Sequence, residues 1–206
     1  MTPASARVLA EVRAELSRLI RYDDESVVQE VWIRQRYDRG AAASYRPART
    51  AAVLTAWHEA GHVVAALAVG ATFSSASIRH GRDSQGRVHG VSGGGADGFV
   101  VDAAGQLAEQ LRDWSGPAGD EQLRAWLAGW RDDGGDARRF RHGMRARFGD
   151  DEAAAWRYCE QALTPLRPRI REVARALLVY PRHLPYPVVA EIAGWPAAAG
   201  AARGPG

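Results

Sequence analysis

The residues best suited to chemistry are two histidines and a glutamate inside an apolar stretch, LTAWHEAGHVVAALAVG, at residues 54–70. On a helical wheel the polar side chains of Thr55, His58, Glu59 and His62 fall at about 60°, 0°, 100° and 40°. The rest of the circumference is apolar, which predicts a buried helix with one polar sector. Three ionisable groups in such a helix are costly without a partner, so the sector predicts a bound group. The alternative is a pair of buried histidines bonded to each other or to the backbone.

The spacing of these residues predicts a metal site. His58 and His62 are four residues apart, so a helix directs both imidazoles to one side, a turn apart. This suits a single metal ion held by nitrogen contacts of about 2.0–2.1 Å. Glu59 lies about 100° around the helix, where its carboxylate can take a proton from a water that the metal acidifies. The pattern His-Glu-x-x-His is typical of zinc peptidases.

A third protein ligand is needed, because catalytic zinc sites use three. Metzincins place a glycine at the position of Ala65 and a histidine at that of Ala68, so this class is excluded. We expect the ligand to open a helix that packs beside the first one. The candidates later in the chain are Glu109, Asp113, Asp132, Asp133, Asp136, His80, His89 and His142.

The elements that must position these residues are mainly helices. Periodicity and breaker residues predict helices over residues 4–21, 49–70, 100–113, 120–131 and 136–148, two pieces within 151–179 interrupted at Pro165 and Pro168, and a short helix within 184–195. Short strands are predicted over 75–79 and 87–91, joined by a turn at 82–86. Gly61 inside a helix costs about 1 kcal/mol relative to alanine, which predicts a neighbouring backbone packed closely against it.

The expected fold class is therefore α+β, mainly α with a small β-sheet. We expect a helical appendage at residues 1–48, a domain at 49–192 that carries the site, and a disordered tail at 193–206. The hydrophobic fraction of 46% and the charged fraction of 25% are typical of globular chains.

Composition also limits the partners. The net charge is +3, and the 27 basic residues are all arginines scattered among acids, so no nucleic-acid partner is expected. Cys159 is the only cysteine, which excludes an internal disulfide and a thiolate metal cluster. No signal peptide or membrane-spanning run is evident, so we expect a soluble, cytoplasmic protein with no membrane partner.

Several motifs resemble one known family. AWHEAGHVVAAL looks like the zinc helix of FtsH-type peptidases, the proteolytic half of membrane-anchored AAA proteases. SIRHGRDSQGRVHGV is similar to the strand pair that follows this helix in the family. VVDAAGQLAEQL is similar to its GG-x-AAEEL helix, with Ala108 and Glu109 in register. The resemblance covers residues 50–192 and is most specific at HEAGH; it implies a zincin-like peptidase domain.

The resemblance also implies a set of roles. The chain would be a zinc metalloendopeptidase with Zn²⁺ as cofactor, His58 and His62 as ligands, and Glu59 as general base. The family's third ligand is an aspartate that opens a later helix, and GGDARRF places Asp136 there. Gly135 replaces the family's usual asparagine, so Asp136 is alternatively a helix N-cap. Asp132 and Asp133 are alternative ligands, and Glu109 is either a ligand or a residue that supports one.

The chain departs from the family in lacking a motor. No GxxxxGK[ST] loop occurs, so no ATPase activity is expected. We therefore expect peptides or flexible, unfolded polypeptides as substrates, with a homo-oligomer or a separate ATPase as open alternatives for a protein partner. RRFRHGMRARF, a basic run at residues 138–148, could attract acidic peptides.

A second hypothesis comes from a different class of protein. It is a non-catalytic interaction scaffold that keeps the peptidase fold with a structural zinc. Glu59 favours the enzyme, because a scaffold needs no base beside its metal.

Overall fold

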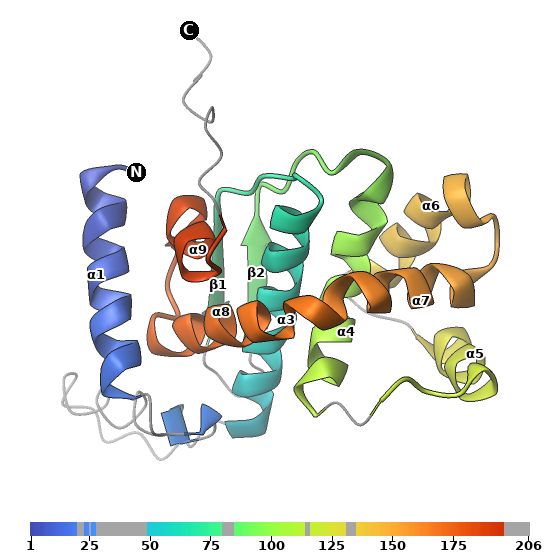
Figure 1. The fold of residues 1–206 in the computed structure, drawn as a ribbon, viewed down its shortest axis with the longest axis horizontal. Coiled ribbons are helices and arrows are strands. Elements are labelled where there is room, and N and C mark those ends of the chain that lie inside the picture. The colour runs from blue at the N-terminus through green and yellow to red at the C-terminus, as the bar shows by residue number, and fades with distance from the viewer. Residues whose placement is uncertain are drawn as a thin grey trace, which may run out of the picture.

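The computed structural model describes residues 1–19, 23, 24, 26, 27, 49–79, 85–113, 116–130 and 135–195. These residues form a mainly helical fold with one small antiparallel sheet (Figure 1), which confirms the predicted α+β class. The helices are α1 (Pro3–Arg18), α3 (Arg49–Ala68), α4 (Gly98–Arg112), α5 (Asp120–Gly129), α6 (Asp136–Phe148), α7 (Glu152–Leu163), α8 (Arg167–Val179) and α9 (Tyr186–Ile192). Single 3-10 turns are η1 (Gly95–Asp97) and η2 (Thr164–Leu166), and the strands are β1 (Ser75–Arg79), β2 (Gln85–His89) and β3 (Leu184–Pro185).

The central element is α3, which packs against α4, α8 and the sheet. Its side chains at Ala52, Val53, Ala60 and Val64 are fully buried. α4 packs tightly against α3 at Gly61: a Cβ there would lie 2.6 Å from the Cβ of Ala108 and would overlap the carbonyl oxygen of Ala104. The expectation that Gly61 admits a neighbouring backbone is therefore confirmed.

The sheet has the order β2-β1-β3, and both outer strands pair with β1 in antiparallel fashion. The second strand was expected at 87–91 but runs over Gln85–His89, with Gly86 opposite Ile78. Gly86 reads as part of a turn in the sequence, but it is a strand residue whose missing side chain leaves room for a neighbour. Residues 80–84, where most of the predicted turn falls, lie outside the described part of the chain.

The third strand was not predicted. It consists of two residues, one of them proline, so no alternating pattern marks it. Its pairing with Ser75 and Ala76 of β1 brings the start of α9 to the sheet, where the backbone N–H of Tyr186 donates to the carbonyl of Ser74 at 3.1 Å.

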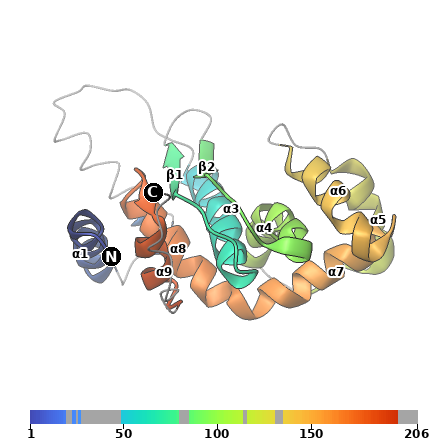
Figure 2. The same ribbon diagram turned by 90° about the horizontal axis from the view of Figure 1, so that it is seen from above.

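The α7–η2–α8 segment runs across the molecule and supports the site elements. Figures 1 and 2 show α8 crossing α3, with α7 extending past α4 towards α5 and α6. The predicted interruption by Pro165 and Pro168 is a single 3-10 turn rather than a break. The predicted helix bounds otherwise agree with the structure to within three residues.

The N-terminal helix packs on the rest of the fold. α1 contacts α8 and α9, and Arg13 forms an ion pair with Glu191 at 2.8 Å. Leu9 and Val12 belong to the same hydrophobic core as α3. Of residues 20–48, which make up much of the predicted helical appendage, only 23, 24, 26 and 27 are described.

The residues directly after α9 belong to the segment that the sequence assigned to a disordered tail, but they pack on the fold. Ala193 is buried, and the ring of Trp195 lies 4.7 Å from the guanidinium carbon of Arg169. Residues 196–206 lie outside the described part. Across the described residues, no helix combines the length and the apolar character needed to span a membrane.

Candidate metal centre

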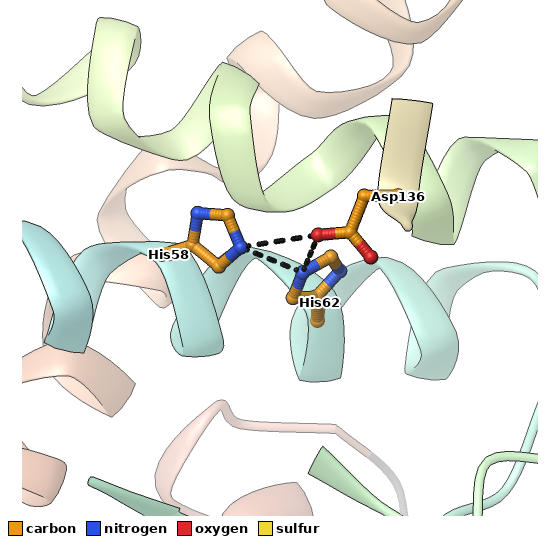
Figure 3. Close-up of side chains that lie close together, drawn as sticks. All are labelled: His58, His62 and Asp136. Carbon is orange, nitrogen blue, oxygen red and sulfur yellow. Dashed lines mark hydrogen bonds and ion pairs between the residues drawn. The ribbon is translucent and has the colours of Figure 1, made fainter. Parts of the chain in front are cut away.

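Three side chains converge on one point, as Figure 3 shows. His58 and His62 project from the middle of α3, and Asp136 is the first residue of α6. The Nε2 atoms of His58 and His62 lie 3.0 Å apart. Oδ2 of Asp136 lies 3.3 Å from Nε2 of His58 and 3.4 Å from Nε2 of His62. The three residues that the sequence proposed as ligands are thus the ones that the fold brings together.

The second nitrogen of each imidazole has a partner of its own. Nδ1 of His58 lies 2.6 Å from Oε1 of Glu109, and Nδ1 of His62 lies 2.7 Å from the carbonyl oxygen of Val101. Both partners are acceptors, so each Nδ1 carries the proton. In the neutral rings both Nε2 atoms then present lone pairs. With Oδ2 of Asp136, three acceptors face one another.

Such a cluster favours a positive charge at its centre. Burial lowers the pKa of His58, but its bonds to Asp136 and Glu109 and the charge of Glu59 outweigh this and raise the pKa to about 10. Burial would raise the pKa of Asp136, but its bonds to His58 and His62 and the charge of Arg139 hold that pKa well below its usual range. The site therefore takes up a proton when no other cation is present.

The donor set fits a zinc-like ion. A tetrahedral ion with contacts of about 2.0–2.1 Å holds its ligand atoms about 3.3 Å apart. The three separations of 3.0, 3.3 and 3.4 Å match that spacing. Imidazole nitrogens with a carboxylate oxygen suit a borderline metal, whereas Ca²⁺ and Mg²⁺ prefer oxygen ligands throughout.

Glu59 lies beside this cluster, against the sheet. Its residue is 6% exposed, and burial raises the pKa of its carboxyl, which the charges of His62 and His58 partly offset. A Cβ on Gly86 of β2 would come within 2.6 Å of the Glu59 carboxylate carbon. The glycine in β2 therefore provides the space that the carboxylate occupies.

A second glycine makes room for the imidazoles. Gly105 lies in the middle of α4, and a Cβ there would be 2.5 Å from Nε2 of His58 and 2.6 Å from Nε2 of His62. Ordinary contacts are about 3.5 Å or longer. Only a glycine at this position lets α4 pack over the two rings in their present places.

An arginine links the aspartate to α4. Arg139 donates to Asp136 one turn earlier on α6, and its Nε donates to Oδ1 of Asp102 at 2.9 Å. The bridge fixes the start of α6, and with it Asp136, against the helix that covers the histidines.

The cluster opens into a cleft of about 1380 Å³. His58, Glu59 and His62 lie along it, with β2 on one side and α6 on the other. Val91, which is 44% exposed, adds an apolar side chain to the lining. Its volume exceeds the range of about 300–1,000 Å³ that is typical of small-molecule pockets.

The other sequence candidates lie elsewhere. Glu109 contacts Nδ1 of His58, on the side of the ring away from the cluster. Asp113 is exposed beside Arg112, and the ring of His89 is tilted by 58° against that of His183, with ring centres 5.2 Å apart. His142 is exposed and lines the cleft, whereas His80, Asp132 and Asp133 lie outside the described residues.

The alternative of Asp136 as a helix N-cap is wrong. The N-cap of α6 is Gly135, whose φ of 83° is left-handed, and Asp136 is the first helical residue. A left-handed backbone suits glycine, which accounts for Gly135 at this position.

Sequence reasoning missed four supporting residues: Gly86, Val101, Gly105 and Asp102. The sequence did carry a signal for Gly105: like Gly61, it lies inside a predicted helix, where glycine is less stable than alanine and so indicates close packing. The carbonyl of Val101 could not be singled out from the sequence, since every residue has a backbone carbonyl.

Comparison of the chain with protein-family models, with curated proteins and with solved structures found no match.

Proposed function

We propose that this chain is a zinc-dependent metalloendopeptidase that hydrolyses peptide bonds in flexible or unfolded polypeptides. The observation that carries the proposal is the convergence of three lone pairs, from Nε2 of His58, Nε2 of His62 and Oδ2 of Asp136, at separations of 3.0–3.4 Å. Glu109 and the carbonyl of Val101 hold both imidazoles in this orientation. The resemblance of AWHEAGHVVAAL to the FtsH-type zinc helix supports the same reaction.

The number of ligands favours catalysis over a structural role. Structural zinc sites use four protein ligands, whereas catalytic sites use three and leave one position open. The described residues supply three, and they line an open cleft. The scaffold alternative accounts for neither the cleft nor the placement of Glu59.

Each residue has a distinct task in the proposed reaction. A bound zinc ion would supply Lewis acidity, which polarises a carbonyl and lowers the pKa of a water. Glu59 accepts the proton from the attacking water and passes it to the leaving amine. Its burial suits this exchange, because a raised pKa brings the carboxyl closer to neutral pH.

The proposal also includes the substrate, a protein partner and the cellular location. The edge strand β2 lies beside the site and can pair with an extended peptide whose backbone is not already bonded. A homo-oligomer or a separate ATPase stays an open alternative for delivering structured substrates. A cytoplasmic location fits a chain whose only cysteine, Cys159, is buried and needs no oxidising compartment.

The test combines metal analysis with proteolysis. We expect about one zinc per chain after purification without chelator, and cleavage of β-casein that stops on addition of a chelator and returns with zinc. Glu59→Gln keeps the shape but cannot accept the proton, so it should retain zinc and lose at least about 10²-fold in rate. Wild-type turnover in this variant would remove Glu59 from the mechanism.

The third ligand is tested separately. Asp136→Ala should weaken zinc binding, whereas Asp133→Ala serves as the matched control from the same segment. If Asp136→Ala left the zinc affinity unchanged and Asp133→Ala reduced it, the third ligand would be Asp133.

A further inference from the structure

The cleft carries cationic side chains that the proposed reaction does not use. Arg87 of β2 and Arg138 of α6 both line it, and both are exposed. Within the described part of the chain neither arginine takes part in an ion pair. The third arginine of the lining, Arg139, is already engaged by Asp136 and Asp102.

The two arginines approach the site from different elements. Figures 1 and 2 show β2 and α6 on either side of α3 and α4. Residues of all four elements line the cleft. Arg138 is next to Arg139, two residues after Asp136. The charge of Arg87 is close enough to Glu59 to lower the pKa of that carboxyl slightly against the effect of burial.

The acids of the lining do not balance these charges. The described acidic residues of the cleft are Glu59, Asp102 and Asp136. Asp102 and Asp136 are bonded to Arg139, and Asp136 also faces both histidines. Glu59 belongs to the catalytic group. The part of the cleft that a substrate would fill is therefore lined by positive charge.

Arg138 lies on a face of α6 that borders the cleft along its length. Arg138, His142 and Ala146 follow at four-residue spacing, and all three line the cleft. Gly143 also lines the cleft, but a Cβ there would be 2.9 Å from the Cβ of Phe99, so the space beside this glycine is taken by α4. Arg138 and His142 are therefore the long side chains that this part of α6 presents to the cleft.

We propose that Arg87 and Arg138 make this cleft selective for polypeptide segments that carry aspartate or glutamate side chains next to the scissile bond. The inference rests on the proposed peptidase function, since it names the substrate class of the same site. A guanidinium offers paired N–H donors that match a carboxylate. An exposed ion pair changes a binding constant modestly, by a factor of about 1.4 to 5. Two such pairs should give roughly fivefold selectivity at low salt.

The test uses three unstructured peptides that differ only in carrying glutamate, glutamine or lysine at the same positions. We expect kcat/KM of the zinc-loaded chain to be about five times higher for the glutamate peptide than for the glutamine peptide, and lowest for lysine. High salt should reduce these differences. Arg138→Glu and Arg87→Glu should each lower the glutamate preference, and the double variant should reverse it.

Arg124→Glu is the matched control, because it makes the same change in net charge at an exposed arginine of α5 that does not line the cleft. It should keep the selectivity of the wild type. Circular dichroism melting of each variant shows that its fold is intact. Equal rates for the three peptides, or a preference that only the control variant changes, would overturn the inference.

Binding separates this inference from the peptidase proposal. Fluorescence anisotropy of labelled peptides with the Glu59→Gln chain should show the same order of affinities without turnover. If no peptide is cleaved but the glutamate peptide binds best and Arg138→Glu removes this, charge selection stands and the peptidase proposal fails. If all peptides are cleaved and none is preferred in either assay, the peptidase proposal stands and charge selection fails. Absence of detectable binding of any peptide would also overturn charge selection.

Discussion

Replacing Gly105 by alanine should remove zinc from the site while the chain stays folded. The new Cβ would lie 2.5 Å from Nε2 of His58 and 2.6 Å from Nε2 of His62. An ordinary contact is about 3.5 Å, so one or both imidazoles must move by about 1 Å. Metal sites hold their ligand distances to within about 0.2 Å, so a displacement of this size disrupts the ligand set.

The expected loss of zinc affinity is at least about 100-fold, the upper end of what outer-shell substitutions cause. Affinity is measured by competition with a chromophoric chelator. Gly129→Ala is the control, because it is also a helical glycine and a Cβ there meets no atom within 4 Å. Circular dichroism should show unchanged helix content in both variants. Wild-type zinc affinity in Gly105→Ala would refute the reasoning, because the ion could not then lie between the two Nε2 atoms.

Three further predictions follow from contacts around the site and in the core. Gly86→Ala should abolish proteolysis but retain zinc, because its Cβ would displace the Glu59 carboxylate and not the ligands; retained turnover would show that the carboxylate has room to move. Glu109→Ala should weaken zinc binding by about 10- to 100-fold by freeing the His58 ring, and Glu109→Gln, which keeps an acceptor oxygen, should recover part of it. Cys159 should resist thiol reagents until the chain unfolds, because burial blocks access and raises the pKa of its thiol; labelling of the native chain at the unfolded rate would contradict its placement in the core.

The sequence predicted the two histidines of the ligand cluster from their spacing, because residues four apart on a helix share one side. The residues alone left eight candidates for the third ligand, and the resemblance to FtsH-type peptidases singled out Asp136. The approach of Asp136 to α3 is a long-range contact, which leaves no local pattern. The helices were predicted because their apolar periodicity is a local signal, continuous over ten or more residues in all but α9.

Features that depend on distant contacts were not predicted. β3 consists of two residues of the segment that follows α8, and it is a strand because these residues pair with β1. The paired residues are more than a hundred positions apart in the sequence, so the pairing leaves no local pattern. Gly86 was assigned to a turn because a glycine after polar residues usually marks one. In the fold the same glycine is needed because Glu59, from another element, fills its side-chain space. The sequence shows the glycine but not the residue that approaches it.

The partners of the four acids around the site explain why Glu59 is the one suited to exchange protons. Glu109 is bonded to His58, Asp102 to Arg139, and Asp136 to Arg139 and the histidines. Within the described residues no hydrogen bond to the Glu59 carboxylate is formed, although burial raises its pKa. A carboxylate whose oxygens already accept bonds from a histidine or an arginine is not free to take a proton from a water. Glu59 lacks these bonds and lines the cleft, so it is the acid among the four that can take a proton from a substrate-side water and release it again.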